Sequence, residues 1–99
     1  MKIQTLARKI PLPRTLTRFA HHHVKQIFNK FSAQVSNVHV ELRDKNGRRG
    51  GGDKQCRIRI QLAVGNALVV QEEQASLRTA IRRATDRAAK EIRNLLRRA

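Results

Sequence analysis

The sequence predicts an α+β fold in the order β-α-β-β-β-α, in which a four-stranded sheet carries two helices packed on one face. Two segments place apolar residues at the helical period of about 3.6, and the strand segments alternate with a period of about two. Three of the strands follow one another without an intervening helix. This order favours an antiparallel-rich sheet with both helices on the same side, where their apolar stripes supply the core.

The N-terminal part is expected to form one strand and one helix. Residues 2–6 alternate in the manner of a short strand. Pro11 and Pro13 then predict a loop, because the residue before each proline is pushed out of helical geometry. A helix over residues 14–31 follows, basic on its exposed side. Phe28 is expected at the margin of its buried stripe. The stripe itself is predicted to contain Leu16, Phe19, Ala20, His23, Val24, Ile27 and Phe31.

The middle of the chain predicts three consecutive strands. Residues 38–42 and 56–62 alternate apolar with polar side chains, which is typical of strands with one buried face. The Gly-rich, charged segment 44–54 between them predicts a hairpin with a long tip. A turn at Gly65 and Asn66 leads into a last strand over residues 67–71.

The last helix, over residues 77–98, separates a core face from a cationic face. Ser76 is expected to cap it. Eight of its side chains are Arg or Lys and two are acidic. At about 100° per residue, the core face is predicted to contain Leu77, Ala80, Ile81, Ala84, Ala88, Ile92 and Leu95. The opposite face, here called the cationic ridge, consists of Arg82, Arg83, Lys90, Arg93 and Arg97. Guanidinium forks stay charged and match phosphate oxygens, so this helix indicates a polyanion-binding protein.

The overall charge supports the same class of partner. Twenty-two basic and seven acidic residues give a net charge of +15, spread over both halves of the 99-residue chain. Such a charge favours RNA, DNA or an anionic membrane surface. No apolar run reaches the roughly 18 residues of a membrane span, and the N-terminus lacks a signal-peptide stretch, so we expect a cytoplasmic protein. Residues 1–99 are expected to form a single domain.

The sequence offers no arrangement suited to catalysis or metal binding. The consecutive residues His21–His23 point about 100° apart in a helix and cannot converge on one ion. Glu72 and Glu73 diverge if they lie in a strand. Asp44 and Asp53 bracket a hairpin, where salt bridges are favoured over a metal-dependent nuclease site. We therefore expect no enzyme, metal, cofactor or small-molecule substrate.

Three further features concern the hairpin, the aromatic residues and the cysteine. The segment 46–54 lacks the spacing of a nucleotide-binding loop, which leaves a basic hairpin tip or an RNA-contacting finger bearing Arg48 and Arg49. All three Phe lie in the first helix, so the strands offer none for base stacking, and recognition should rest on backbone charge and shape. Cys56 is the only cysteine and is expected to be a buried, inert thiol.

Several stretches together carry a resemblance to a known family. They are Asn37-Val38-His39-Val40-Glu41-Leu42 after a helix, the strands running through Leu68-Val69-Val70, and the helix type Ala80-Ile81-Arg82-Arg83-Ala84-Thr85-Asp86-Arg87. In this order they resemble the ribosome hibernation-promoting factor and ribosome-associated inhibitor family, also called the sigma-factor modulation family, in its short form. The stretch Leu42–Gly47, with Gly50-Gly51 and Asp53–Cys56, is similar to one branch of that family.

The resemblance implies a fold similar to double-stranded-RNA-binding domains and binding to the small ribosomal subunit and its ribosomal RNA. It further implies that the protein blocks the path of mRNA and tRNA and silences translation under stress. The extra domain by which long forms pair ribosomes is absent, so a monomer that does not pair ribosomes is expected. The RNA-binding residues implied by position are Arg18, Lys25, Arg78, Arg82, Arg83, Arg87, Lys90 and Arg93.

Two other functions stay open at this point. A generic binder of structured RNA or DNA would have the same charge but would not recognise the ribosome specifically. A small RNA-processing nuclease would need clustered acids or a histidine base. A different binding surface also stays open, namely the exposed face of the sheet with Arg43, Arg57 and Arg59.

Overall fold

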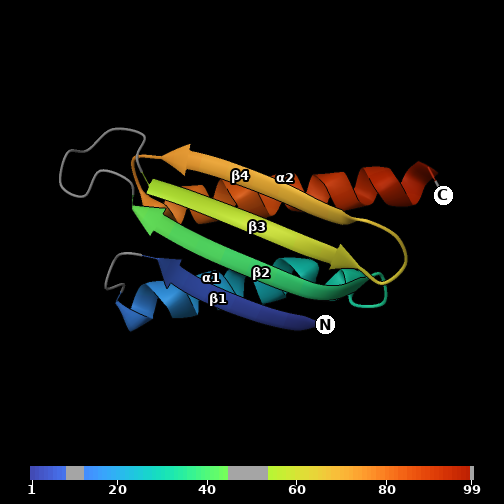
Figure 1. The fold of residues 1–99 in the computed structure, drawn as a ribbon, viewed down its shortest axis with the longest axis horizontal. Helices are drawn as coiled ribbons and strands as arrows, with labels where there is room; N and C mark the ends of the chain where they lie inside the picture. Colours follow the sequence, from blue (N-terminus) through green and yellow to red (C-terminus); the bar gives the residue numbers. More distant parts are fainter. Residues whose placement is uncertain (9–12, 45–53, 99) are drawn as a thin grey trace.

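Four strands form one sheet, and two helices cover one of its faces (Figure 1). The structure is a computed structural model that describes residues 1–8, 13–44 and 54–98. The predicted α+β class, element order and placement of both helices on one face are confirmed. The elements are β1 (Lys2–Arg8), α1 (Arg14–Phe28), the 3-10 turn η1 (Asn29–Phe31), β2 (Val35–Asp44), β3 (Lys54–Leu62), β4 (Ala67–Gln74) and α2 (Leu77–Arg98).

The strands lie in the order β1-β2-β3-β4. β1 runs parallel to β2, while β2, β3 and β4 are antiparallel neighbours. A parallel pair needs a crossover connection, which α1 provides. The register aligns Val40 with Ile58 and Ile58 with Val70, so that apolar side chains of adjacent strands point to the same face.

The core lies between this apolar sheet face and the two helices. In Figure 1, α1 lies behind β1 and β2, and α2 lies behind β3 and β4. Burial of apolar surface at about 25 cal/mol per Å² is the main force holding the layers together. The apolar residues with at most 1% exposure are Ala20, Val24, Phe28, Val35, Val38, Val40, Leu42, Cys56, Ile58, Ile60, Ala80, Ile81, Ala84, Ala88 and Ile92.

The first helix differs from the prediction in its end and in its buried row. It ends at Phe28, and a tighter 3-10 turn, common at helix ends, carries the chain to Phe31, which is buried. Phe28 was expected at the margin but is fully buried. The reason is that Ala20, Val24 and Phe28 are spaced four residues apart and form the row that faces the sheet.

The strands are longer than the alternation predicted. Backbone hydrogen bonds between strands do not require apolar side chains. The paired strands therefore extend into polar residues beyond the alternating segments that predicted them. At one end of the β2–β3 pair, Lys54 Nζ and Asp44 Oδ2 form an ion pair of 2.7 Å, a hairpin salt bridge of the kind expected for Asp44. The turn between β3 and β4 lies where it was predicted, with Gly65 at φ 99°, a conformation that favours glycine.

The second helix confirms the expected core face except at one position. Ser76 precedes α2, and its carbonyl accepts a hydrogen bond of 3.0 Å from the Ala80 N–H, as the carbonyl of an N-cap residue does. Leu95, predicted to be in the core, is 36% exposed. Figure 1 shows the cause, since α2 continues beyond the end of the sheet and leaves its last turns partly uncovered.

Candidate nucleic-acid interface

The outer side of the two-helix layer is basic. Arg83, Lys90 and Arg93 are exposed on α2, on the side opposite the buried row of alanines. Arg18 and Lys25 are exposed on α1, seven residues apart and therefore on one side of that helix. None of these five cations forms an ion pair with the residues that the structure describes. The layer thus presents uncompensated positive charge to the solvent.

Phe19 organises the contact between the two helices. The ring of His23 stacks on it with a centroid distance of 5.6 Å and an interplanar angle of 12°. From α2, the Cζ atoms of Arg78 and Arg82 lie 4.6 Å and 5.6 Å from the Phe19 centroid, within cation–π range. The four residues Phe19, His23, Arg78 and Arg82 are here called the helix seam. The ring therefore holds two of the expected RNA-binding guanidiniums in place.

Sequence reasoning assigned Phe19 to the core and missed this role. The available signal was its position at the edge of the apolar stripe, one turn before His23. A ring at that edge faces the neighbouring helix as well as the sheet, so it can receive side chains from α2. His23 is half-buried, as expected for the edge of the core.

Burial keeps the His23 imidazole from gaining a proton easily. Desolvation lowers the pKa of His23 below its ordinary value of 6.5; the charge of Asp86 acts in the opposite direction, while Arg82 and His22 lower it further. Its Nε2 atom is buried and has no hydrogen-bond partner among the described residues. The positive charge of the helix seam at neutral pH therefore comes from its arginines.

Arg87, one of the expected RNA-binding residues, has partners on β4. Its guanidinium donates a 2.8 Å hydrogen bond to the carbonyl of Gln71 on β4 and forms an ion pair with Glu72. Arg87 lies on the side of α2 that faces β4. A helical projection of α2 alone cannot reveal these partners, because they belong to another element. Any phosphate bound there would compete with Glu72. The two expected finger residues, Arg48 and Arg49, lie outside the described part of the chain.

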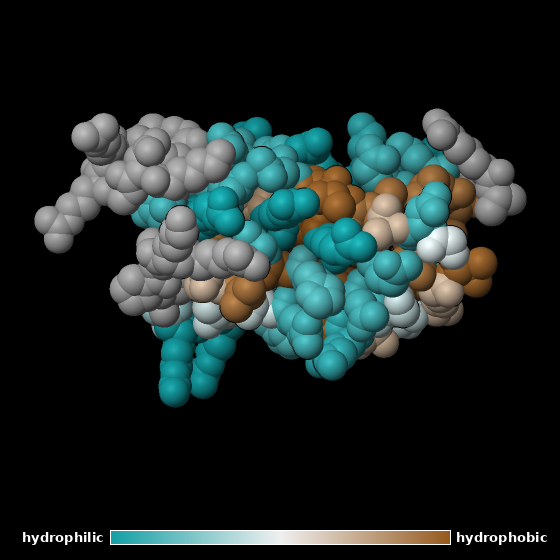
Figure 2. All heavy atoms as spheres, viewed as in Figure 1, coloured by the Kyte–Doolittle hydropathy of each residue, from teal (hydrophilic) through white to brown (hydrophobic). Residues whose placement is uncertain are grey.

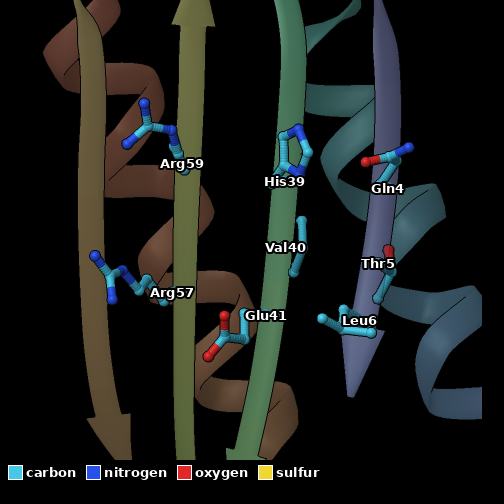
Figure 3. A pocket seen from close by; sticks show the side chains of 8 residues that line it. All are labelled: Gln4, Thr5, Leu6, His39, Val40, Glu41, Arg57 and Arg59. Atoms are coloured by element: carbon cyan, nitrogen blue, oxygen red, sulfur yellow. The ribbon is translucent and has the colours of Figure 1, made fainter. Parts of the chain in front are cut away.

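The opposite side of the molecule, the open face of the sheet, is also rich in polar side chains (Figure 2). Arg57 and Arg59 are exposed on β3, while Arg43 Nη2 lies 3.3 Å from Glu41 Oε1 on β2. A hollow of about 620 Å³ opens on this face (Figure 3). The protein therefore has two polar, cationic surfaces on opposite sides of one sheet.

Comparison with known proteins decides the family. Residues 3–99 match the family described as sigma 54 modulation protein/S30EA ribosomal protein. The chain belongs to this family. The expected membership in the hibernation-promoting factor family is thereby confirmed. No curated protein matches the sequence.

Two solved structures share the fold of this S30EA-family chain. A ribosomal subunit interface protein from Coxiella burnetii superposes with a TM-score of 0.79 at 14% identity, covering 96% of this chain and 97% of the other. The N-terminal domain of Protein Y from Thermus thermophilus gives 0.75 at 21% identity, with 96% and 99% covered. Similarity at these identities shows a common fold, and the family itself indicates a ribosome-associated modulation protein.

Two acidic residues of the S30EA-family chain that could have served a nuclease have structural partners. Glu72 pairs with Arg87 and accepts a 3.1 Å hydrogen bond from Gln74, and Asp44 pairs with Lys54. Within the described residues, no group of three His, Cys, Asp or Glu side chains could hold a metal ion. No helix among them is long and apolar enough to cross a membrane.

Cys56 confirms the expected buried thiol. Its side chain is fully buried on β3, and desolvation, assisted by the charge of Glu72, raises the pKa of the thiol to about 12. A thiol with this pKa is almost entirely protonated at neutral pH and is a poor nucleophile.

Proposed function

We propose that residues 1–99 act as one ribosome-binding domain that binds the small ribosomal subunit through the outer side of α1 and α2. By occupying the path of mRNA and tRNA, the bound protein silences translation under stress. The observation that carries this proposal is the single basic layer formed by the two helices. Membership in the S30EA family supports the ribosome as the binding partner.

The exposed cations of this layer are suited to phosphates of folded RNA. Arg83, Lys90 and Arg93 on α2, with Arg18 and Lys25 on α1, have no ion-pair partner among the described residues. Binding to phosphates releases condensed counterions from the RNA, so log affinity falls with log salt by about 0.7 to 0.9 per phosphate contacted. We expect a slope that corresponds to several contacts.

The helix seam supports the same surface in a different way. Arg78 and Arg82 rest against Phe19, so their side chains are already restricted in the free protein. A restricted arginine loses less conformational entropy on binding than a freely rotating one. The seam therefore supplies preorganised donors on the same two helices that carry the exposed cations.

The inhibition needs no chemical step. A protein bound across the mRNA and tRNA path excludes both ligands by its volume, and they exclude it when they are bound first. Steric competition therefore predicts that prior loading of the subunit with mRNA and initiator tRNA weakens binding of this protein.

The test is co-sedimentation with purified small subunits, combined with inhibition of translation in vitro. A helix-face variant, Arg83→Gln with Arg93→Gln, removes two exposed charges from α2. A charged hydrogen bond contributes about 1.5 kcal/mol or more, so loss of even one such contact should weaken subunit binding about tenfold. The matched control is a sheet-face variant, Arg57→Gln with Arg59→Gln, which removes the same charge from the opposite side.

Three results would contradict the proposal. Equal weakening by the helix-face and sheet-face variants would mean that net charge alone drives association. Tight binding to duplex RNA without binding to subunits at physiological salt would instead make the protein a generic binder of structured RNA. If prior loading with mRNA and tRNA had no effect, the steric mechanism would be wrong.

A further inference from the structure

The sheet face without helices carries a hollow that the proposed ribosomal contact does not use. It opens over β1, β2 and β3 and has a volume of about 620 Å³. Figure 2 shows mainly polar side chains across this face. Six of its lining residues have side chains on the open side of the sheet: Gln4, Leu6, His39, Glu41, Arg57 and Arg59 (Figure 3).

Two arginines give the hollow its charge. Arg57 and Arg59 lie two residues apart on β3, which places their Cα atoms about 7 Å apart on one face. Figure 3 shows both guanidinium groups pointing toward β4. Both are exposed, and neither has a hydrogen-bond or ion-pair partner among the described residues. Their mutual repulsion in the free protein is relieved by any anion that binds between or along them.

The rest of the hollow is different in character. The strand register places His39 opposite Arg59, and Gln4 opposite His39 on the far side. Glu41, which pairs with Arg43, lies opposite Arg57. The cations therefore lie toward β4, while an imidazole ring and an amide lie toward β1. A carboxylate on β2 repels phosphates from that side of the hollow.

This polarity fits a single-stranded nucleic acid. A strand of RNA has phosphates at regular intervals along one side and flat bases along the other. Imidazole rings and guanidinium planes are surfaces on which unpaired bases stack. An extended acidic peptide can match the spacing of Arg57 and Arg59 with carboxylates two residues apart, but it has no flat bases to stack on His39. The stacking face, and not the spacing of the charges, therefore favours RNA.

We propose that this hollow binds an unpaired RNA segment, with successive phosphates on Arg57 and Arg59 and a base against His39. The protein then has two RNA-binding surfaces on opposite sides of its sheet, one for folded RNA on the helices and one for a single strand. The sheet surface does not depend on the ribosomal assignment, because it recognises unpaired RNA from any source.

The test measures binding of a fluorescently labelled oligoadenylate of about six nucleotides by fluorescence anisotropy over a range of salt concentrations. The sheet-face variant should lower the slope of log affinity against log salt by about 1.4, because each lost single-strand phosphate contact removes about 0.7. The helix-face variant carries the same charge change and should lower the slope by clearly less than the sheet-face variant does. His39→Ala should weaken binding about fivefold or more through lost stacking, with the slope unchanged.

Thermal melting of each variant checks that the fold is retained. Substitution of Arg57 and Arg59 by lysine separates charge from shape, since lysine keeps the charge but not the planar fork. Equal loss of binding in the sheet-face and helix-face variants would overturn the proposal. Displacement of the oligonucleotide by an equal concentration of oligoglutamate of the same charge would also overturn it and make an acidic protein segment the occupant. The proposed function is judged separately by subunit binding of the helix-face variant.

Discussion

The helix seam provides a direct test of how the basic surface is built. Phe19→Leu keeps an apolar side chain of similar size but removes the aromatic ring. Two cation–π contacts, from Arg78 at 4.6 Å and Arg82 at 5.6 Å, are lost, together with the stack on His23. Each cation–π contact contributes about 0.5 to 1 kcal/mol at an exposed site, and a stacked aromatic pair about 0.5 to 1.5 kcal/mol. The free energy of unfolding should therefore fall by about 1.5 to 3.5 kcal/mol, a substantial part of the 5 to 15 kcal/mol typical of a domain.

The measurement is urea denaturation followed by far-UV circular dichroism, because the chain has no Trp or Tyr to report by fluorescence. A double-mutant cycle combining Phe19→Leu with Arg78→Gln isolates the pairwise contribution. We expect a coupling energy of about 0.5 to 1 kcal/mol. The cycle with Arg82→Gln should give a smaller value, because that guanidinium lies farther from the ring.

The cation–π contribution of Phe19 is refuted if both coupling energies lie within about 0.3 kcal/mol of zero. This conclusion requires that the slope of the free energy of unfolding against urea concentration is the same in all variants. The ring would then contribute only its apolar area. Subunit binding gives a second readout. If the seam preorganises its arginines, Phe19→Leu should weaken binding although it removes no charge.

The other predictions concern buried groups. Ile81→Ala leaves a cavity in a fully buried site and should lower the free energy of unfolding by about 2 to 5 kcal/mol. The melting temperature should then fall by at least about 8 °C. Arg83→Ala should change the free energy of unfolding by no more than about 0.5 kcal/mol. Cys56 should react with iodoacetamide at pH 8 only after denaturation, because its pKa is raised to about 12; rapid labelling of the native protein would contradict this burial. The lowered pKa of His23 means that the unfolded chain binds more protons below about pH 6.5, so stability present above that pH is lost as the pH falls. His23→Gln should flatten this part of the profile, and an identical profile in the variant would show that other groups cause it.

Much of the fold could be predicted because its signals are local and periodic. Alternation over Val38–Leu42 and Cys56–Leu62, and the helical spacing around Ala80–Ile92, predicted which side of each element is buried. The limits of the elements were less predictable. The end of α1 at Phe28 depends on how the chain turns toward β2, and strand pairing continues beyond the apolar residues that signal it.

The candidate site also has features that the sequence predicted and features that only the packed structure shows. Sequence alone predicted the exposed cations on the outer side of α2, because a helical projection shows which residues lie opposite the core. It could not pair Arg87 with Glu72, since these residues meet only when α2 packs beside β4. It also could not predict that Phe19 receives two guanidiniums from the other helix.

The sequence by itself therefore determined the class of fold, the basic character and the family of this protein. Periodicity, net charge and local motifs are properties of neighbouring residues along the chain. The tertiary structure alone decided which cations stay free and which are held. It also brought His39 of β2 beside Arg59 of β3 on the open face. Such contacts join residues far apart in sequence, and their energies depend on distances that exist only after the sheet and helices have packed.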